Sequence, residues 1–218
     1  PTQVELRSIM SPPIPYYNEI FGDYYSLCED LGLKIKYSNI DNIICASEYL
    51  KPEYMIYVDT REQRPLKFKR PIELKALKYG DYAFSDRDAT CNCYVERKSL
   101  VDLIGTISGG YDRFCKEIER SIEEEANLII VVEAKLIDAL NFNHIRKAHD
   151  KSRVYSKIKA TPDFIFHRIR KLNQEYPTIQ FLFVNGRKES ARVIEKIFMS
   201  GCIYKKADLQ LAYDSKIL

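Results

Sequence analysis

Two short stretches, Gly80-Asp81-Tyr82 and Val95-Glu96-Arg97-Lys98-Ser99-Leu100-Val101-Asp102, decide how this 218-residue chain is organised. Glu96 and Lys98 stand two positions apart, so an extended strand directs both side chains to the same face. Asp81 opens another strand-like segment one short hairpin upstream. If the two strands are neighbours, two carboxylates and an ammonium group meet at one point of a sheet.

Carboxylate and carbonyl oxygens are the ligands that Mg²⁺ or Mn²⁺ prefers. We expect Asp81, Glu96 and a main-chain carbonyl between Glu96 and Lys98 to supply them. Lys98 would then face the group bound to the cation, and a phosphate suits a cation and a lysine together. A single Asp or Glu in a charged chain is usually just solvated, so the combination carries the prediction. It indicates phosphodiester hydrolysis.

A third motif, Val58-Asp59-Thr60-Arg61-Glu62, lies upstream, and Asp102 follows Lys98 by four residues. In this order the motifs resemble the nuclease domain of the XPF family. The members of that family are structure-specific DNA endonucleases of the PD-(D/E)XK group. The resemblance extends over residues 55–199 and is strongest over 58–113. It implies an α/β, restriction-endonuclease-like fold, with a central mixed β-sheet flanked by helices. It also implies a divalent-metal-dependent endonuclease acting on branched or junction DNA.

The resemblance assigns a catalytic set and a metal-binding set that have three acids in common. The catalytic set is Asp59, Asp81, Glu96 and Lys98, and the metal-binding set is Asp59, Glu62, Asp81 and Glu96. Lysine is ordinarily protonated near pH 7, so we expect Lys98 to orient the attacking water and stabilise the pentavalent phosphorane. For Asp59 and Glu62, solvation at the end of a strand is the alternative.

The same resemblance makes Arg61, Arg97 and Arg113 candidate phosphate binders, with a structural ion pair as the alternative for each. Asp102 matches the family's last acidic position, where it would orient Arg97 or Lys98. Its alternative is an acid favoured by the dipole at a helix N-terminus. The family usually has Gly-Arg where this chain has Gly110-Tyr111, with the arginine two residues later.

Two segments carry a local excess of positive charge, although the net charge is only +3. Residues 144–172 hold nine Lys/Arg and two Asp, and residues 61–70 hold five Lys/Arg and one Glu. Basic segments beside a metal site suit a polyanion such as DNA, while solvated surface charge is the alternative. We expect substrate selection to come from residues 146–171, the N-terminal extension or a partner.

No tandem helix-hairpin-helix signature follows residue 199, so the chain resembles the stand-alone nucleases of this group found in phages and mobile elements. The resemblance also implies dimerisation. Two other functions stay open, a nuclease acting on linear duplex of the restriction type and a non-catalytic DNA-binding subunit. Intact Asp81, Glu96 and Lys98 argue against the second of these.

Composition is ordinary for one globular domain, with 45% hydrophobic and 30% charged residues. We expect a nuclease domain over residues 51–218 and an extension of unknown role over 1–50. The longest aliphatic run, Leu128–Val132, is too short for a membrane span, and no secretory signal is visible. We therefore expect an intracellular protein, in the cytoplasm of a bacterial cell or phage-infected host, or the nucleus if eukaryotic. The pair Cys91 and Cys93 is too little for a zinc site.

Hydrophobic periodicity and turn residues predict the elements. Strands are expected at 54–59, 72–77, 81–84 and 92–96, forming a meander with its acids near one edge, and later at 128–133 and 179–184. Helices are expected at 99–107, 111–126, from 161 and at 189–199. Before residue 50 we expect an irregular arm over 1–15, a helix over 18–31 and a short strand over 33–37.

Overall fold

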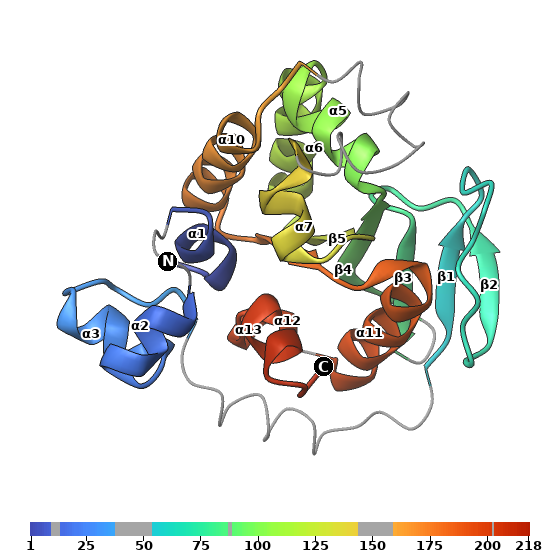
Figure 1. Ribbon diagram of the computed structural model, residues 1–218. Coiled ribbons are helices and arrows are strands. Elements are labelled where there is room, and N and C mark those ends of the chain that lie inside the picture. The colour runs from blue at the N-terminus through green and yellow to red at the C-terminus, as the bar shows by residue number, and fades with distance from the viewer. Residues whose placement is uncertain (10–13, 38–53, 87–88, 144–158, 202) are drawn as a thin grey trace.

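A computed structural model of the protein describes residues 1–9, 14–37, 54–86, 89–143, 159–201 and 203–218 (Figure 1). Its centre is a six-stranded mixed sheet in the order β2-β1-β3-β4-β5-β6. The strands are β1 (Ile56–Asp59), β2 (Ile72–Lys75), β3 (Tyr82–Asp86), β4 (Ala89–Lys98), β5 (Asn127–Val132) and β6 (Ile179–Phe183). With helices on both faces of this sheet, the predicted α/β class with a flanked mixed sheet is confirmed.

The predicted meander is wrong at β2. This strand lies outside β1 and pairs with it in parallel, whereas β3 pairs with the other edge of β1 in antiparallel fashion. The connection from Thr60 to Pro71 is long enough to carry the chain back to the beginning of β1, which a hairpin turn is not. Asp59 and Glu96 consequently lie on central strands, and Asp81 lies directly before one, so none of these acids belongs to an edge strand.

Helices cover the sheet in two groups. One face packs against α5 (Leu100–Ser108), α6 (Tyr111–Glu123), α7 (Leu136–Leu140) and α10 (Pro162–Glu175), and the other against α11 (Gly186–Ser200), α12 (Ile203–Lys206) and α13 (Leu209–Asp214). Alternate residues of β4 enter the two cores, with Tyr94 in the first and Val95 in the second. This alternation places Glu96 and Lys98 on the α5–α6 side and Arg97 on the α11 side.

Three short helices precede the sheet, where we expected an irregular arm followed by one helix. They are α1 (Gln3–Arg7), α2 (Ile14–Phe21) and α3 (Tyr24–Asp30). Thr2 and Glu5 form a capping box that begins α1, and Gly22, at φ +84°, separates α2 from α3. Residues 33–37 form no strand.

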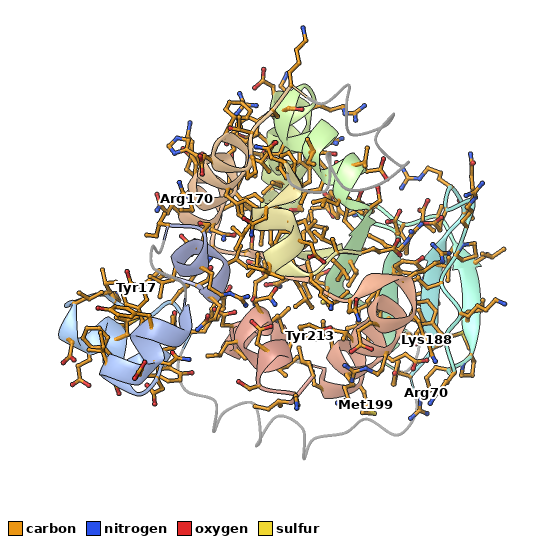
Figure 2. The ribbon with its side chains drawn as sticks, in the orientation of Figure 1. Tyr17, Arg70, Arg170, Lys188, Met199 and Tyr213 are labelled. Atoms are coloured by element: carbon orange, nitrogen blue, oxygen red, sulfur yellow. The ribbon has the colours of Figure 1, made fainter. Side chains whose placement is uncertain are left out.

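The first helix packs on the rest of the protein. Val4 belongs to the same core as the α5–α6 face of the sheet, and the Gln3 N–H donates to Asp208 Oδ2 at 2.6 Å. Arg170 on α10 donates to Ser8 Oγ at 2.8 Å, where α1 and α10 lie side by side (Figure 2). The beginning of the predicted extension is therefore part of the folded body.

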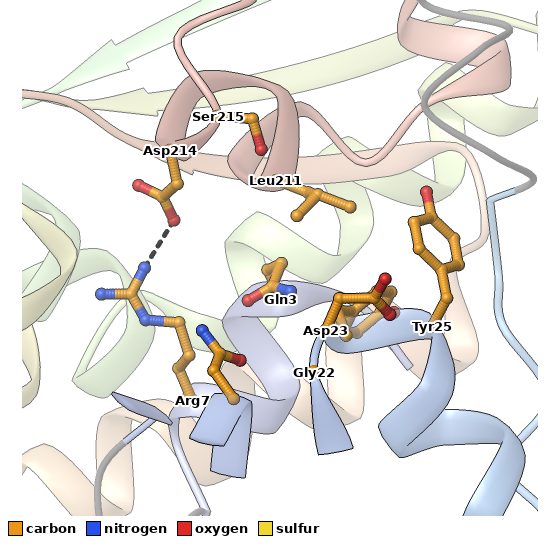
Figure 3. A pocket seen from close by; sticks show the side chains of 10 residues that line it. Gln3, Arg7, Gly22, Asp23, Tyr25, Leu211, Asp214 and Ser215 are labelled. Atoms are coloured by element: carbon orange, nitrogen blue, oxygen red, sulfur yellow. Dashed lines mark hydrogen bonds and ion pairs between the residues drawn. The ribbon is translucent and has the colours of Figure 1, made fainter. Parts of the chain in front are cut away.

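A cavity of about 540 Å³ lies between these N-terminal helices and α13 (Figure 3). Arg7 and Asp214 form an ion pair of 2.5 Å in its wall, and Gln3, Asp23 and Tyr25 also line it. Its polar lining lies away from the β3–β4 acids.

Two expectations about composition can be compared with the described residues. Cys28 and Cys93 are buried, while Cys45, the side chain of Cys91 and Cys202 lie outside the described residues. Within those residues, no helix has the length and apolar character needed to cross a membrane.

Candidate active site

The β3–β4 hairpin brings Asp81 and Glu96 together, as the sequence predicts. Tyr82 pairs with Val95 in the antiparallel ladder, and the Asp81 N–H donates to the Val95 carbonyl at 2.8 Å. Asp81, directly before β3, therefore stands opposite Glu96 on β4. On the other side of Asp81, its carbonyl accepts from the Asp59 N–H at 2.8 Å. The hydrogen bonds of three central strands thus fix the backbone of this carboxylate.

Gly80 permits the close approach of the chain before β3 to the backbone of Val95 on β4. Its φ is +61°, and a Cβ added to it would lie 2.7 Å from the Val95 oxygen, which is backbone and cannot move aside. Gly80→Ala is expected to destabilise the protein by about 2 kcal/mol or more, through left-handed strain and this clash. Urea unfolding monitored by circular dichroism measures the loss.

Gly105→Ala is the matched control, since Gly105 lies inside α5 with nothing within 4 Å of an added Cβ. Alanine is a better helix former than glycine, so this variant should be neutral or slightly stabilised. Equal unfolding midpoints for the two variants would show that the approach of Gly80 to β4 is not tight.

The Asp81 carboxylate is crowded by other acids. One of its oxygens, Oδ2, accepts the Arg97 main-chain N–H at 2.8 Å. Burial raises the pKa of Asp81 to about 7, together with the negative charge of Glu96 and, to a smaller extent, that of Glu62. A site that concentrates negative charge in this way is one that a bound cation would relieve.

Lys98 lies against Glu96 on the same face of β4. Its Nζ is 2.7 Å from Glu96 Oε1, and both side chains are largely buried, at 14% and 19% exposure. The ammonium also lies 5.9 Å from the centre of the Phe114 ring, which comes from α6. The predicted pairing of Glu96 and Lys98 on one face is thus present as a direct ion pair.

Glu117 is a further acid at this site, and we did not single it out from the sequence. It lies on α6 one turn after Phe114 and is half-buried, whereas Glu119, Glu123 and Glu124 are exposed. Burial and then the charge of Glu96 raise the pKa of Glu117, while Lys98 acts in the opposite direction. Its place in the α6 pattern, directly before the buried Ile118, was the available signal.

Arg97 points to the opposite face of the sheet, where it takes part in ion pairs. Its Nη2 lies 3.0 Å from Glu62 Oε2 and its Nη1 lies 3.1 Å from Glu133 Oε1. Arg187 on α11 also approaches Glu133, at 3.8 Å. Of the two alternatives for Arg97, the structure displays the ion pair. Glu62 is thereby held by Arg97, yet it stays close enough to Asp81 for its charge to raise the pKa of that carboxyl.

Asp59 is held by donors from its own neighbourhood. Only 2% of it is exposed, and its two oxygens accept from the Arg61 main chain and guanidinium and from the Leu77 N–H. Despite burial, these donors lower the pKa of Asp59. These contacts fix the loop after β1. Asp59 also stands beside Asp81, since its N–H donates to the Asp81 carbonyl, and it follows Tyr57 by two residues on the α5–α6 face, so its part in a metal site stays a prediction. The Arg61 side chain is 72% exposed beside Asp59.

Asp102 and Arg113 lie at the α5–α6 corner. The Ser99 hydroxyl donates to Asp102 Oδ2 at 2.6 Å and accepts the Asp102 N–H at 3.1 Å, so the two residues cap α5. This is the helix-terminus alternative for Asp102. Arg113 is exposed on α6 and, with Asp102, Gly105 and Gly109, lines an open groove.

Asp81 and Glu96 are the donors in the described structure that best fit a divalent cation. They are hard oxygen ligands, adjacent across two strands, and the pKa of Asp81 is raised by its burial and by the charge of Glu96. Among the described residues, no three His, Cys, Asp or Glu side chains converge as a ready-made cage. A site with few protein ligands matches Mg²⁺, which keeps several waters and takes phosphate oxygens as ligands.

Comparisons with known proteins place this geometry in a family. The ERCC4 domain matches residues 58–197, more than half of the chain. Among solved structures, XPF from Aeropyrum pernix in complex with DNA is 24% identical with a TM-score of 0.46, covering 66% of this chain and 63% of its own. XPF from Aeropyrum pernix in a second structure is 23% identical with a TM-score of 0.46, covering 65% and 63%.

This chain thus spans less than two thirds of the length of those XPF chains, and no curated protein matches it. The ERCC4 match includes Asp59, Asp81, Glu96 and Lys98, together with the α6 helix and the strands that carry them. The chain therefore belongs to the ERCC4 domain family, the XPF-type nucleases.

Proposed function

We propose that this protein is a divalent-metal-dependent DNA endonuclease that hydrolyses phosphodiester bonds in branched or junction DNA. The observation that carries the proposal is the group formed by Asp81, Glu96 and Lys98 on one face of β3 and β4, inside the segment that matches the ERCC4 domain. Two crowded carboxylates beside a lysine suit a cation and a phosphate, whereas a module that only binds DNA gains nothing from acids next to phosphate.

In this proposal Asp81 and Glu96 hold Mg²⁺ or Mn²⁺, and Asp59 and Glu62 are the further acids of the site. When bound, the cation would supply Lewis acidity and lower the pKa of a water molecule. Lys98, on the same face, places its ammonium where negative charge grows on the phosphate, and thereby favours the transition state. Arg97 keeps β4 in place. The expected products carry 5′-phosphate and 3′-hydroxyl ends.

Exposed basic side chains would hold the DNA. Arg61 and Arg113 remain exposed in the structure, and Arg64, Lys67 and Lys69 extend the basic character along the loop between β1 and β2. Most of the second basic segment, residues 144–158, lies outside the described residues. Self-association also stays a prediction, which sedimentation of the purified protein measures.

The test is cleavage of end-labelled flap, fork, four-way junction and linear duplex DNA in Mg²⁺, Mn²⁺ or EDTA. Wild-type protein is expected to cut the branched forms and to prefer them over linear duplex in direct competition. In EDTA it is expected to cut none of these substrates. Glu96→Gln, which removes a proposed ligand with little change in size, separates this activity from a contaminating nuclease.

Each other result assigns a different function. Preference for linear duplex would favour a nuclease of the restriction type. Tight binding without cleavage in any metal would favour a non-catalytic DNA-binding subunit. Cleavage that survives Glu96→Gln would place the active site elsewhere.

A further inference from the structure

Lys98 and the proposed cation compete for the same carboxylate. Lys98 Nζ lies 2.7 Å from Glu96 Oε1, an ion pair that is mostly shielded from water. If Glu96 ligates a cation, as the proposed function requires, this oxygen has to be shared or given up. A buried ammonium without an anionic partner is costly, so the cation-bound state needs a second acceptor near Lys98 until DNA supplies its phosphate.

Glu117 is the residue placed to be that acceptor. It projects from α6, which packs against α5 and β5 beside the Glu96 face of β4. Phe114, one turn earlier on the same side of α6, lies 5.9 Å from Lys98 Nζ. Both Lys98 and Glu96 lie within electrostatic range of the Glu117 carboxylate. In contrast to the exposed Glu119, Glu123 and Glu124 on the same helix, Glu117 is half-buried.

We propose that Glu117 is a positioning residue whose carboxylate becomes the ion-pair partner of the Lys98 ammonium when Glu96 ligates the cation. Lys98 would then stay charged and close to the phosphate, while both Glu96 oxygens become available. The inference rests on the proposed function, because it needs a cation on Glu96.

Direct ligation of the cation by Glu117 is the competing role. Among the described residues, no trio of acids stands in a metal-binding arrangement that would include Glu117 with Asp81 and Glu96. Phe114, one turn earlier on α6, lies against Lys98, and the Lys98 charge lowers the pKa of the Glu117 carboxyl. We therefore assign Glu117 to Lys98, and a binding experiment separates this role from direct ligation.

Mn²⁺ binding measured by titration calorimetry on the DNA-free protein distinguishes these roles. Glu117→Gln is expected to weaken Mn²⁺ binding about tenfold, or about 1.4 kcal/mol, because Lys98 then has only Glu96 as its partner. In a Lys98→Met background no ammonium competes for Glu96. There the same Glu117→Gln change is expected to alter the affinity by less than about twofold, a non-additivity that a double-mutant cycle reports.

Glu123→Gln is the matched control, since it removes the same charge from an exposed position at the end of α6. It should leave Mn²⁺ affinity unchanged in both backgrounds, and thermal unfolding without metal verifies that every variant is folded. An equal loss in both backgrounds would overturn the proposal, since Glu117 would then act on the cation directly. No loss in either would also overturn it. If Glu96→Gln binds Mn²⁺ as tightly as wild type, the proposed function itself fails.

Discussion

Asp81→Asn is expected to lower the rate of cleavage by roughly 10³-fold or more, about 4 kcal/mol of transition-state stabilisation. The change removes one of the two carboxylates proposed to hold the cation. It keeps the size of the side chain and an oxygen that can still accept the Arg97 N–H, now at 2.8 Å. Single-turnover cleavage of the preferred branched substrate in saturating Mg²⁺ measures the loss.

The same variant is expected to be more stable than wild type at alkaline pH when metal is removed. Burial and the neighbouring acids raise the pKa of Asp81 to about 7 in the folded protein, against about 3.9 in an unfolded chain. The folded state therefore binds this proton more tightly, which favours folding fully below about pH 4. That contribution is lost as the pH rises through 7.

Thermal unfolding in EDTA at pH 5 and pH 8 measures this effect. Wild type should lose more stability between the two pH values than Asp81→Asn does, and Ca²⁺ at pH 8 should raise the melting temperature of wild type but not that of Asp81→Asn. Asp138→Asn, an exposed acid on α7, should behave as wild type. Full activity in Asp81→Asn would refute the metal site, and an unchanged pH dependence would show that Asp81 is not strained.

Much of this site was predictable because it depends on local geometry. Glu96 and Lys98 share a face through the period of a strand, and a hairpin is the simplest way to put Asp81 beside them. Both inferences need no knowledge of the rest of the chain. The boundaries of α5 and α10 follow in the same way from their capping residues, Ser99 and Thr161.

The position of β2 and the partners of the charged residues were not predictable in this way. The sequence indicates a strand near Ile72 but not the edge of β1 to which it pairs. Asp59 and Glu62 look equivalent to Asp81 until the fold supplies donors for them from Leu77 and Arg97. Glu117 was hidden among several acids of α6, since only packing against β4 and β5 distinguishes it from its exposed neighbours.

Arg97→Met is expected to destabilise the protein by about 3–5 kcal/mol, because it leaves Glu62 without its cation and Glu133 with only the more distant Arg187. The side chains of Arg97, Glu62 and Glu133 are only 15%, 8% and 14% exposed. Arg97 joins the loop after β1 to the end of β5, so its loss affects both. Urea unfolding measures the change, and Arg97→Met combined with Glu62→Gln and Glu133→Gln should recover most of it.

DNA binding by the same variant separates the two roles considered for Arg97. If Arg97 only pairs with Glu62 and Glu133, the folded fraction of Arg97→Met should bind DNA within about twofold of wild type, with the same salt dependence. Arg113→Met, at an exposed position, should do the reverse, with stability within about 0.5 kcal/mol but weaker binding and a salt slope reduced by about 1. A reduced salt slope in Arg97→Met would instead make Arg97 a phosphate contact, reached only if DNA displaces one of its two carboxylates.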